Sequence, residues 1–536
     1  MGPCINQSSL SKSLSTDSQT EKAVPGAQSA INLVEYDSHP TFWKKLWPRV
    51  VLVVVSIVAA ISIAKSLNWP FVHDAPLMHY IVFLMSNGFS PYRDIFDMNM
   101  PGTYVIHWLV FHTLGGSAIA WRSFDLLLSV IATVAALYIT RPYDRYAGWI
   151  VGGILVIGHL SVGPIDLGQR DYIMAVLLLT AYAFLFAAIR RLRPSMLFFS
   201  AVLFTWATLI KPTSLLLTVL MLALGVYIAR KRGQQTRKYV VSAVLGCVCT
   251  IGFFAALLLK EHSLGAFFQI VFRLVPYHAS MGNASWKGLL LNMHQANWAL
   301  TLIVGLLLLR YCRCWGNWEQ WALLVGGLFG GLSYVIQRKG WHYHTYPEAF
   351  FLCIWIITLC LLALRTRSRF RYLALTLLLF NAFVIAPYFL VKEVLSGYSM
   401  TNLNSMRADL RTLGGQALNR NVQCFDWGRG CINALYQERI VQTTGAIYDF
   451  YLFPVRPDPV PAIYQQKFYK VISMHPPKVL IVTDDSWPPG LGYSRIGNWP
   501  VFSEFLQKNY RLDRAPNLRA NSVQGIGYRV YLRNGP

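Results

Sequence analysis

The chain has 536 residues, of which 54% are hydrophobic, 14% aromatic and only 13% charged. Soluble domains carry about 25% charged residues, so the composition argues against the three or four soluble domains that the length alone would allow. The formal net charge of +24 would indicate a nucleic-acid partner in a soluble chain. Here the basic residues lie in short clusters between long apolar segments, as in membrane proteins. We therefore expect a polytopic α-helical membrane protein with no nucleic-acid partner. The sequence also contains neither the phosphate-loop nor the dinucleotide-binding glycine motif.

Residues 1–46 are rich in Ser, Gln, Asn and Gly and have few large apolar side chains. They contain no apolar run of the kind found in a secretory signal, and they offer too little apolar surface to offset the cost of ordering. We expect a disordered cytoplasmic tail. An aromatic and basic collar leads from it into the first apolar segment, and it consists of Trp43, Lys44, Lys45, Trp47 and Arg49.

Residues 47–395 alternate apolar runs with short basic loops, which the positive-inside rule places in the cytoplasm. The basic loops lie at 141–145, 190–193, 230–238, 310–313 and 365–371. Three apolar segments, 50–66, 102–119 and 123–140, precede the first of these loops, and an odd number of crossings would invert every later loop. We expect residues 102–120 to lie along or re-enter the outer face, which leaves about eleven transmembrane helices.

Two of the expected transmembrane helices are short. The apolar runs 197–210 and 215–229 fall below the roughly 20 residues that a full crossing needs, and Lys211-Pro-Thr-Ser214 joins them. We expect the outer surface to be indented there, so that polar side chains reach membrane depth while facing a cavity.

Residues 396–536 carry charged residues, Pro and Asn at the density of a soluble protein. The runs 479–483 and 528–532 have the pattern of strands, and 501–510 has that of an amphipathic helix. We expect an extracytoplasmic soluble α/β domain. Cys424 and Cys431 would lie on the oxidising side, where a disulfide and two free thiols are equally compatible with the sequence. The cysteines in or beside the apolar runs lack the partners of a zinc site.

The loop after the first apolar segment offers a candidate base. Asp74 lies at or just above the membrane interface, where a carboxylate can deprotonate an attacking alcohol. A solvated loop residue or a helix cap is the alternative. Further along this loop, Arg93 and Asp94 have the alternative of pairing with each other.

Two later segments offer cations. Arg170, in Gly168-Gln-Arg-Asp171, is an outer-side arginine beside an apolar wall and suits an anion, whereas an acidic residue at the start of a helix is ordinary. The segment 337–347 contains two cations, two histidines and three aromatic residues, a surface suited to a phosphate or pyrophosphate with a sugar stacked nearby. Its charged and imidazole side chains are Arg338, Lys339, His342 and His344. An aromatic belt with snorkelling basic side chains is the alternative, and zinc is a minor one because no third ligand is evident.

The ordered set of these segments resembles integral-membrane glycosyltransferases of the GT-C type. The resemblance rests on Asp74, Gly88-Phe-Ser-Pro-Tyr-Arg-Asp94, Asn99-Met-Pro-Gly102, Gly168-Gln-Arg-Asp171 and Gln337-Arg-Lys-Gly-Trp-His-Tyr-His344. It covers roughly residues 50–390. Within this type, the sequence resembles more specifically the bacterial relatives of protein O-mannosyltransferases and of the aminoarabinose lipid A transferase.

The resemblance implies inverting transfer of a sugar from a polyprenyl-phosphate donor to a hydroxyl of a glycan, lipid or protein acceptor. It places Asp74 at the position of the family's catalytic carboxylate. Many members carry a second acid directly after it, but Ala75 stands here. We therefore expect one base, with Asp94 as a candidate second acid. The residues that would bind the donor phosphate or the sugar are Arg93, Arg170, Lys211, Arg338, Lys339, His342 and His344. No cofactor is expected, and a divalent metal is not indicated.

Three other classes remain. A transporter or flippase of a lipid-linked sugar would show inverted repeats and charges deep in its helices, and neither is evident. A polymerase or ligase of the O-antigen type would more often carry a large loop between late helices. A non-catalytic assembly subunit would give Asp74 no special role. We expect a multi-pass protein of the bacterial inner (cytoplasmic) membrane with a cytoplasmic N-terminus and a periplasmic C-terminal domain. The sequence identifies neither the sugar nor the acceptor.

Overall fold

The computed structural model describes residues 42–290, 293–366, 369–396, 400–427, 430–456, 458–487, 490–516 and 527–535. Residues 1–41 of the expected tail therefore lie outside the described part of the chain. Helix α1 (Phe42–Ser66) begins inside the segment 1–46 that we expected to be tail.

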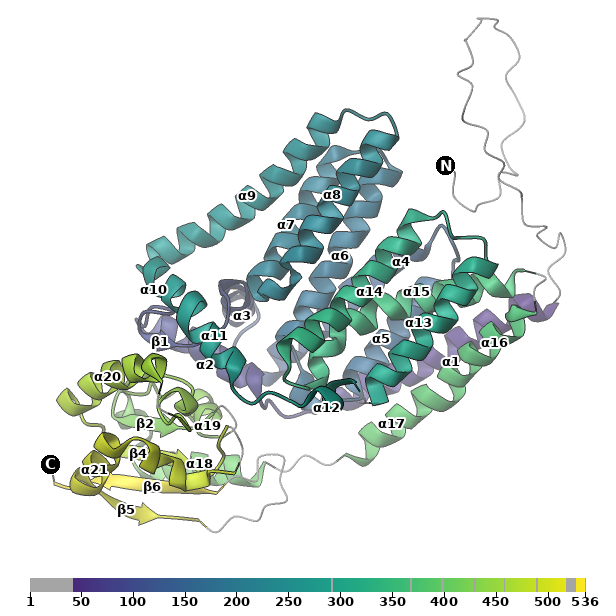
Figure 1. Cartoon of the computed structure of the whole chain (residues 1–536). Coiled ribbons are helices and arrows are strands. Elements are labelled where there is room, and N and C mark those ends of the chain that lie inside the picture. The colour runs from purple at the N-terminus through teal and green to yellow at the C-terminus, as the bar shows by residue number, and fades with distance from the viewer. Residues whose placement is uncertain are drawn as a thin grey trace, which may run out of the picture.

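A bundle of helices occupies the described chain as far as residue 395 (Figure 1). Its longer helices after α1 are α4 (Ala118–Thr140), α5 (Ala147–Leu160), α6 (Arg170–Arg190), α7 (Pro194–Ile210), α8 (Leu215–Lys231), α9 (Thr236–Lys260), α13 (Met293–Tyr311), α14 (Trp318–Gln337), α15 (Tyr346–Leu364), α16 (Phe370–Phe380) and α17 (Ala386–Leu395). The π-helical turn η5 (Asn381–Ile385) joins the last two. Helices α6 and α15 are the most enclosed of the apolar helices.

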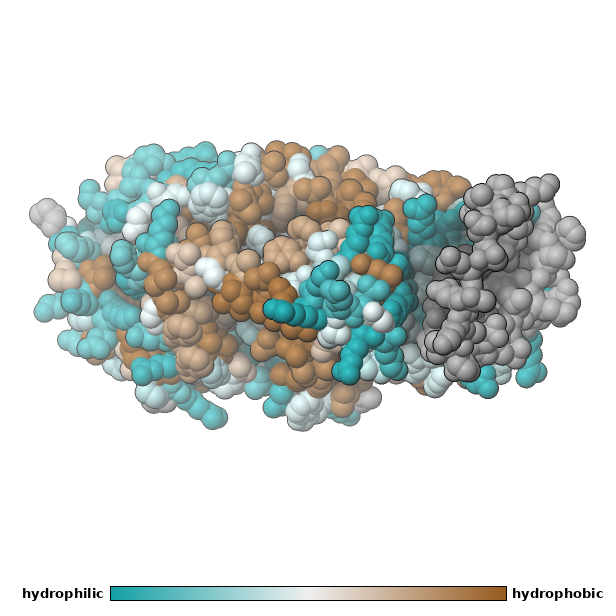
Figure 2. Space-filling view, turned by 90° about the horizontal axis from the view of Figure 1, so that it is seen from above, coloured by the Kyte–Doolittle hydropathy of each residue, from teal (hydrophilic) through white to brown (hydrophobic). Residues whose placement is uncertain are grey.

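Seven stretches of the described helices are long and apolar enough to cross a membrane, and three shorter apolar helices accompany them. Figure 2 shows one face of the molecule coloured by hydropathy. Apolar side chains cover much of its middle part, in agreement with these apolar helices. The expected number of about eleven transmembrane helices stays a prediction. Helix α3 (Pro101–Thr113) has 13 residues and is not among these stretches, in keeping with the expected non-crossing segment.

Short helices cap the end of the bundle that faces the C-terminal segment (Figure 1). They are α2 (Asp74–Ser86), the 3-10 turns η1 (Pro164–Asp166), η2 (Pro212–Ser214) and η4 (His342–Thr345), and α10 (Leu264–Gln269), η3 (Ile270–Leu274), α11 (Val275–Ser280) and α12 (Trp286–Leu290). Helix α7 has 17 residues, which span about 25 Å against a hydrocarbon core of about 30 Å. Because so short a helix does not span the whole hydrocarbon layer, polar groups at its end can lie at membrane depth within the bundle.

The C-terminal segment contains a four-stranded sheet in the order β2-β4-β6-β5. Its strands are β2 (Val422–Phe425), β4 (Val479–Thr483), β5 (Tyr510–Arg514) and β6 (Tyr528–Arg533). The apolar strands β2 and β4 pair in parallel, and β6 runs antiparallel to both β4 and β5. The helices of this segment are α18 (Thr401–Thr412), α19 (Cys431–Glu438), α20 (Pro459–Met474) and α21 (Pro500–Asn509). The strands and the helix expected from the sequence are present. That this segment is a soluble domain with a boundary at residue 396 stays a prediction.

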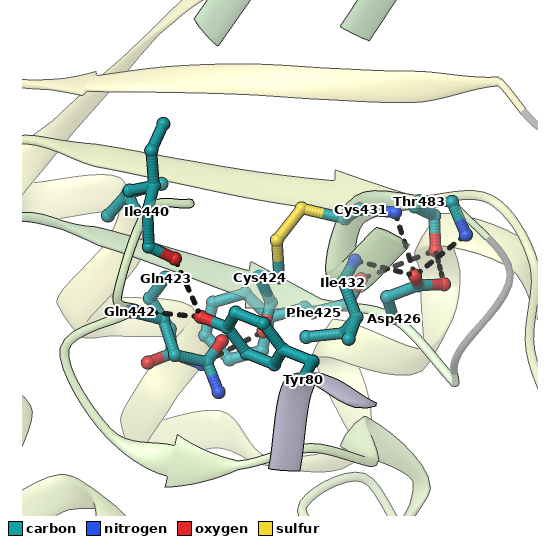
Figure 3. Close-up of a disulfide and its surroundings, with 12 residues drawn as sticks. Tyr80, Gln423, Cys424, Phe425, Asp426, Cys431, Ile432, Ile440, Gln442 and Thr483 are labelled. Atoms are coloured by element: carbon teal, nitrogen blue, oxygen red, sulfur yellow. Dashed lines mark hydrogen bonds between the residues drawn. A yellow bond between two sulfur atoms is a disulfide. The ribbon is translucent and has the colours of Figure 1, made fainter. Parts of the chain in front are cut away.

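The C-terminal segment is joined to the bundle by backbone pairing and by buried side chains. Strand β1 (Ile95–Phe96) pairs in parallel with β3 (Gly445–Ala446). The Tyr80 hydroxyl on α2 donates to the Ile440 carbonyl at 3.1 Å and accepts from the Gln442 amide at 2.9 Å (Figure 3). The two parts of the chain therefore form one continuous structure at this end of the bundle.

Candidate functional site

Asp74 is the first residue of α2, and an unusual backbone turn precedes it. His73 has a φ of 62° and a ψ of −130°, a sparsely populated conformation that costs a non-glycine residue about 1–3 kcal/mol and recurs at functional sites. The turn places the His73 imidazole Nδ1 3.2 Å from a carboxylate oxygen of Asp74. Nε2 of Gln169 lies 3.4 Å from the same His73 nitrogen, and the Gln169 side chain also acts on the carboxylate. The Asp74 side chain remains 29% exposed, so a second molecule can reach it.

The surroundings of Asp74 keep its carboxyl group ionised. Burial by itself would raise the pKa, but the charge and hydrogen bond of His73, the charge of Arg170 and the hydrogen bond of Gln169 outweigh it. The net result is a pKa well below the ordinary value for aspartate. At neutral pH the group is therefore a proton acceptor.

Arg170 connects Asp74 to the rest of the site from the first turn of α6. Asp74, Tyr448, Tyr343 and Asp171 all lie within electrostatic range of its guanidinium group. The turn before α6 depends on Gly168, which has a φ of +63° and lies where a Cβ atom would be 2.1 Å from the Trp121 ring. Gly168 thus lets the chain fold back so that Gln169 and Arg170 reach Asp74.

Three other carboxylates near this end of the bundle, Asp97, Asp166 and Asp171, are enclosed by their partners. Asp97 is fully buried, accepts hydrogen bonds from Asn99 at 2.8 Å and from Tyr104 at 2.5 Å, and has a pKa raised by burial. Asp171 accepts from the Lys211 ammonium at 2.7 Å, and Asp166 pairs with His342 at 2.8 Å. Asp74 differs from these three in being both accessible and ionised.

Asp94 and Arg93 form a local pair in the first loop. Their side chains meet at 2.9 Å and are exposed or half-buried, and the Ser90 amide donates to the same carboxylate at 2.8 Å. The more distant charges that act on them are Glu261 and Lys467. The geometry thus gives the pair a structural role in the loop, and the expectation that either residue serves catalysis stays untested.

The expected cations differ in how far other groups of the protein already pair with them. Lys211 is compensated by Asp171, and burial lowers its pKa to about 8 against that opposing charge. Lys339 donates to the carbonyl oxygens of His278 at 3.1 Å and Ala279 at 3.0 Å and also to that of Met281, and burial likewise lowers its pKa to about 8. Arg338 lies 4.5 Å from the centre of the Trp286 ring, and its Nε has no hydrogen-bond partner among the described residues.

The two histidines of the segment 337–347 fall in the turn η4 and face different surroundings. His342 is 42% exposed and holds Asp166 through Nε2. His344 is buried against the rings of Trp341 and Tyr343, and its Nδ1 has no partner among the described residues. Among the residues that the structure describes, no cluster of three or more His, Cys, Asp or Glu side chains is arranged to hold a metal ion.

Solved structures with this arrangement of helices and C-terminal segment exist. ArnT from Cupriavidus metallidurans bound to undecaprenyl phosphate matches with a TM-score of 0.52 and 14% identity, over 92% of this chain and 98% of that one. The apo form of the same protein gives 0.55 and 12%, over 90% and 98%. The chain has a GT-C-like fold. The apo oligosaccharyltransferase of Archaeoglobus fulgidus gives 0.47 and 12%, over 82% and 70%. No family model matches the sequence, and no curated protein matches it either.

Within this GT-C-like fold, the C-terminal segment contributes residues that sequence reasoning missed. Tyr448 is buried and lies in electrostatic range of Asp97, Asp74 and Arg170. Burial, then the charges of Asp97 and Asp74, raise its pKa, so the hydroxyl stays protonated. The run Tyr448-Asp-Phe-Tyr451, which places three aromatic residues in four positions, was the available signal.

A second contact closes the C-terminal segment over the site. Tyr451 approaches the His278 Nδ1 at 3.2 Å, and the His278 ring stacks on Trp487 at 5.2 Å between centres. The Lys339 ammonium lies 5.4 Å from the same indole. Trp487 begins a Trp-Pro-Pro-Gly sequence, of which residues 488–489 lie outside the described part of the chain.

Proposed function

We propose that the protein is a membrane glycosyltransferase that moves a sugar from a polyprenyl-phosphate donor to an acceptor hydroxyl, with inversion at the anomeric carbon and Asp74 as the general base. The GT-C-like fold supports this class of reaction. The neighbour from Cupriavidus metallidurans is bound to undecaprenyl phosphate, which supports a lipid phosphate as the leaving group here. The donor sugar and the identity of the acceptor (glycan, lipid or protein) stay open.

One observation carries the proposal: an accessible, ionised carboxylate lies beside a half-buried arginine. Asp74 takes the proton of the acceptor hydroxyl, whose oxygen attacks the anomeric carbon from the face opposite the phosphate. The bond between that carbon and the phosphate oxygen breaks, and the electron pair leaves with the phosphate. Arg170 offsets the charge that develops on the leaving oxygen, and Arg338 adds a second guanidinium for the same anion.

The remaining cations have supporting roles in this proposal. Lys211, compensated by Asp171, keeps the local charge near zero until a phosphate arrives. Lys339 holds the chain around residue 279 and so fixes the wall of the site. Arg93, Asp94 and His344 stay candidates from the sequence with no assigned step.

We place the protein in a bacterial inner membrane with its N-terminus in the cytoplasm and its C-terminal segment outside. The basic loops between helices support this orientation. The bond between Cys424 and Cys431 supports it as well, because disulfides persist on the oxidising side of the membrane.

The test is transfer of sugar from a panel of radiolabelled polyprenyl-phosphate sugars in membranes, with wild type compared with Asp74→Asn. The variant keeps the shape of the side chain and removes the base, so transfer should fall by at least about a hundredfold while the donor still binds. Asp94→Asn is the matched control and should retain most transfer. Unchanged transfer by Asp74→Asn would remove Asp74 from the mechanism. Absence of transfer together with movement of labelled lipid between leaflets would make the protein a flippase.

A further inference from the structure

A continuous chain of hydrogen bonds runs inward from His342. Its Nε2 lies 2.8 Å from Oδ2 of Asp166, and the Tyr346 hydroxyl donates to that same oxygen at 3.0 Å. The Tyr346 oxygen is also 2.7 Å from Nδ1 of His159. The chain therefore connects an exposed imidazole in η4 to a buried one in α5.

Beyond His159 the chain ends in a carboxylate that is itself compensated. Nε2 of His159 lies 3.0 Å from Asp125, which pairs with Arg122 at 2.5 Å and accepts from the Gly168 amide at 2.9 Å. Asp125, Asp166, His159 and Arg122 are all at most 3% exposed. Gly168 also supports the turn that carries Arg170, so this chain and the candidate site share a piece of backbone.

The charges of the buried part do not balance without an extra proton. Arg122 compensates one of the two carboxylates, Asp125 and Asp166. Buried charges are strongly unfavourable unless they are paired, so the second carboxylate needs a protonated imidazole. Two imidazoles are available, His159 on the inner side and His342 on the outer side.

The Tyr346 hydroxyl has one hydrogen and two neighbours, and its direction separates two states. When the hydroxyl donates to Asp166, its oxygen accepts a hydrogen bond from Nδ1 of His159. Nε2 of His159 donates to Asp125 as well, so both nitrogens of the His159 ring are then protonated. When it turns to Nδ1 of His159, that ring is neutral and His342 carries the compensating charge. The other oxygen of Asp166 has no hydrogen-bond partner among the described residues.

We propose that His342 gives a proton to the phosphate that leaves during sugar transfer, and that this proton is shared with His159 through Asp166 and Tyr346. The inference rests on the proposed function. In the step, the acceptor hydroxyl loses its proton to Asp74, the bond from anomeric carbon to phosphate oxygen breaks, and Nδ1 of His342 protonates the phosphate. The lipid phosphate leaves as the monoanion, His342 is neutral, and both groups return to their starting states by exchange with water.

The other charged groups around the two imidazoles define what else acts on them. Helices α6, α14 and α15 pack against η4. Its surroundings include Arg170 and Asp171 of α6, Glu348 of α15, and Arg338 and Lys339 directly after α14, with His344 in the turn itself. Around His159, the Tyr172 ring stacks at 3.7 Å, and Glu393 of α17 acts on Arg122 from further away. Asp166 and Asp171 are paired with His342 and Lys211, which leaves the guanidinium groups near η4 for an incoming phosphate.

The test is the pH dependence of transfer by the full-length protein in membranes. Wild-type transfer should fall as the pH rises and the proton donor is lost. His342→Gln should transfer about tenfold to a hundredfold more slowly near neutral pH and lack that alkaline fall. Asp166→Asn removes the carboxylate that stabilises the protonated ring, so the fall should begin about one pH unit lower. His159→Gln removes the competing imidazole, so the fall should begin at higher pH.

Tyr346→Phe keeps the packing and removes the hydroxyl that connects the two rings. In this background His159→Gln should no longer move the alkaline fall, and Tyr334→Phe, which removes a buried phenol outside the chain, should leave the coupling intact. A merely structural network would lower the rate without moving the pH dependence, and that result overturns the inference. If wild type transfers and Asp74→Asn does not, but His342→Gln keeps the alkaline fall, the inference is wrong and the proposed function stands. If wild type transfers no sugar, the proposed function is wrong and the inference falls with it.

Discussion

The imidazole Nδ1 of His73 lies 3.2 Å from the carboxylate of Asp74, the next residue in the chain. Side chains of neighbouring residues ordinarily diverge in regular structure, and the left-handed φ of His73 is what brings these two together. The strained turn thus places an imidazole directly beside the candidate base.

We predict that His73→Gln moves the acid limb of the transfer reaction to higher pH. The His73 charge is, after burial, the first of the influences on the Asp74 pKa, and it acts to lower it. Without that charge the pKa rises, and because the base works only when ionised, activity is lost at a higher pH as the solution is acidified. Because the low pKa of Asp74 places the wild-type limb below the ordinary range for aspartate, the rate is measured from about pH 6 down to about pH 2, with exposed His112→Gln as the control. An acid limb that does not move would mean that His73 does not set the state of Asp74.

We predict that Tyr448→Phe slows transfer without unfolding the protein. The buried hydroxyl lies within electrostatic range of Asp97, Asp74 and Arg170, and loss of one polar interaction of this kind costs about 1 kcal/mol, which corresponds to about fivefold in rate. Tyr469→Phe, in helix α20 of the same segment, should leave the rate unchanged. Equal rates for both variants would remove the C-terminal segment from the site.

Sequence reasoning located features that depend on local pattern. The strand at 479–483 is found at those bounds because a five-residue apolar run can be buried on both faces of a sheet. Asp74 was identified because its position after the first apolar helix is itself a local property. The short run before Lys211 likewise predicted a short helix, which is α7.

Contacts between distant segments were out of reach. Lys211 and Asp171 were each noticed, but their pairing joins the ends of two different helices, and periodicity carries no information about it. Tyr448 reaches the site because β3 pairs with β1, a strand about 350 residues earlier in the chain. The chain from His342 to Asp125 draws on five separate elements, so the sequence singled out His342 without any of its partners.

We predict that Gly102→Ala destabilises the protein and lowers transfer. Gly102 lies near the start of α3, where a Cβ atom would be 2.7 Å from the Leu209 carbonyl oxygen and 2.8 Å from its carbon. Those are backbone atoms, so α3 must move away from the end of α7, and the loop holding Asp97 moves with it. Overpacking of this kind costs about 1–3 kcal/mol, measurable as a lower melting temperature. Gly158→Ala, where no atom lies within 4 Å of the added Cβ, is the matched control, and equal melting temperatures would contradict the close approach.

We predict that Cys424 and Cys431 react with a membrane-impermeant thiol reagent in intact cells or spheroplasts only after reduction. The structure joins them in a disulfide across seven residues, between β2 and the start of α19 (Figure 3). Nearby, Asp426 accepts from the Cys431 amide at 2.8 Å and thereby fixes the same turn. Closing a loop of this length stabilises the folded state by about 2.5 kcal/mol in the chain-entropy model, so reduction should also speed proteolysis of the C-terminal segment. The double variant Cys424→Ser/Cys431→Ser should lose the reductant-dependent signal. Labelling before reduction would contradict the disulfide, and no labelling after reduction and mild unfolding would place the C-terminal segment in the cytoplasm and reverse the proposed orientation.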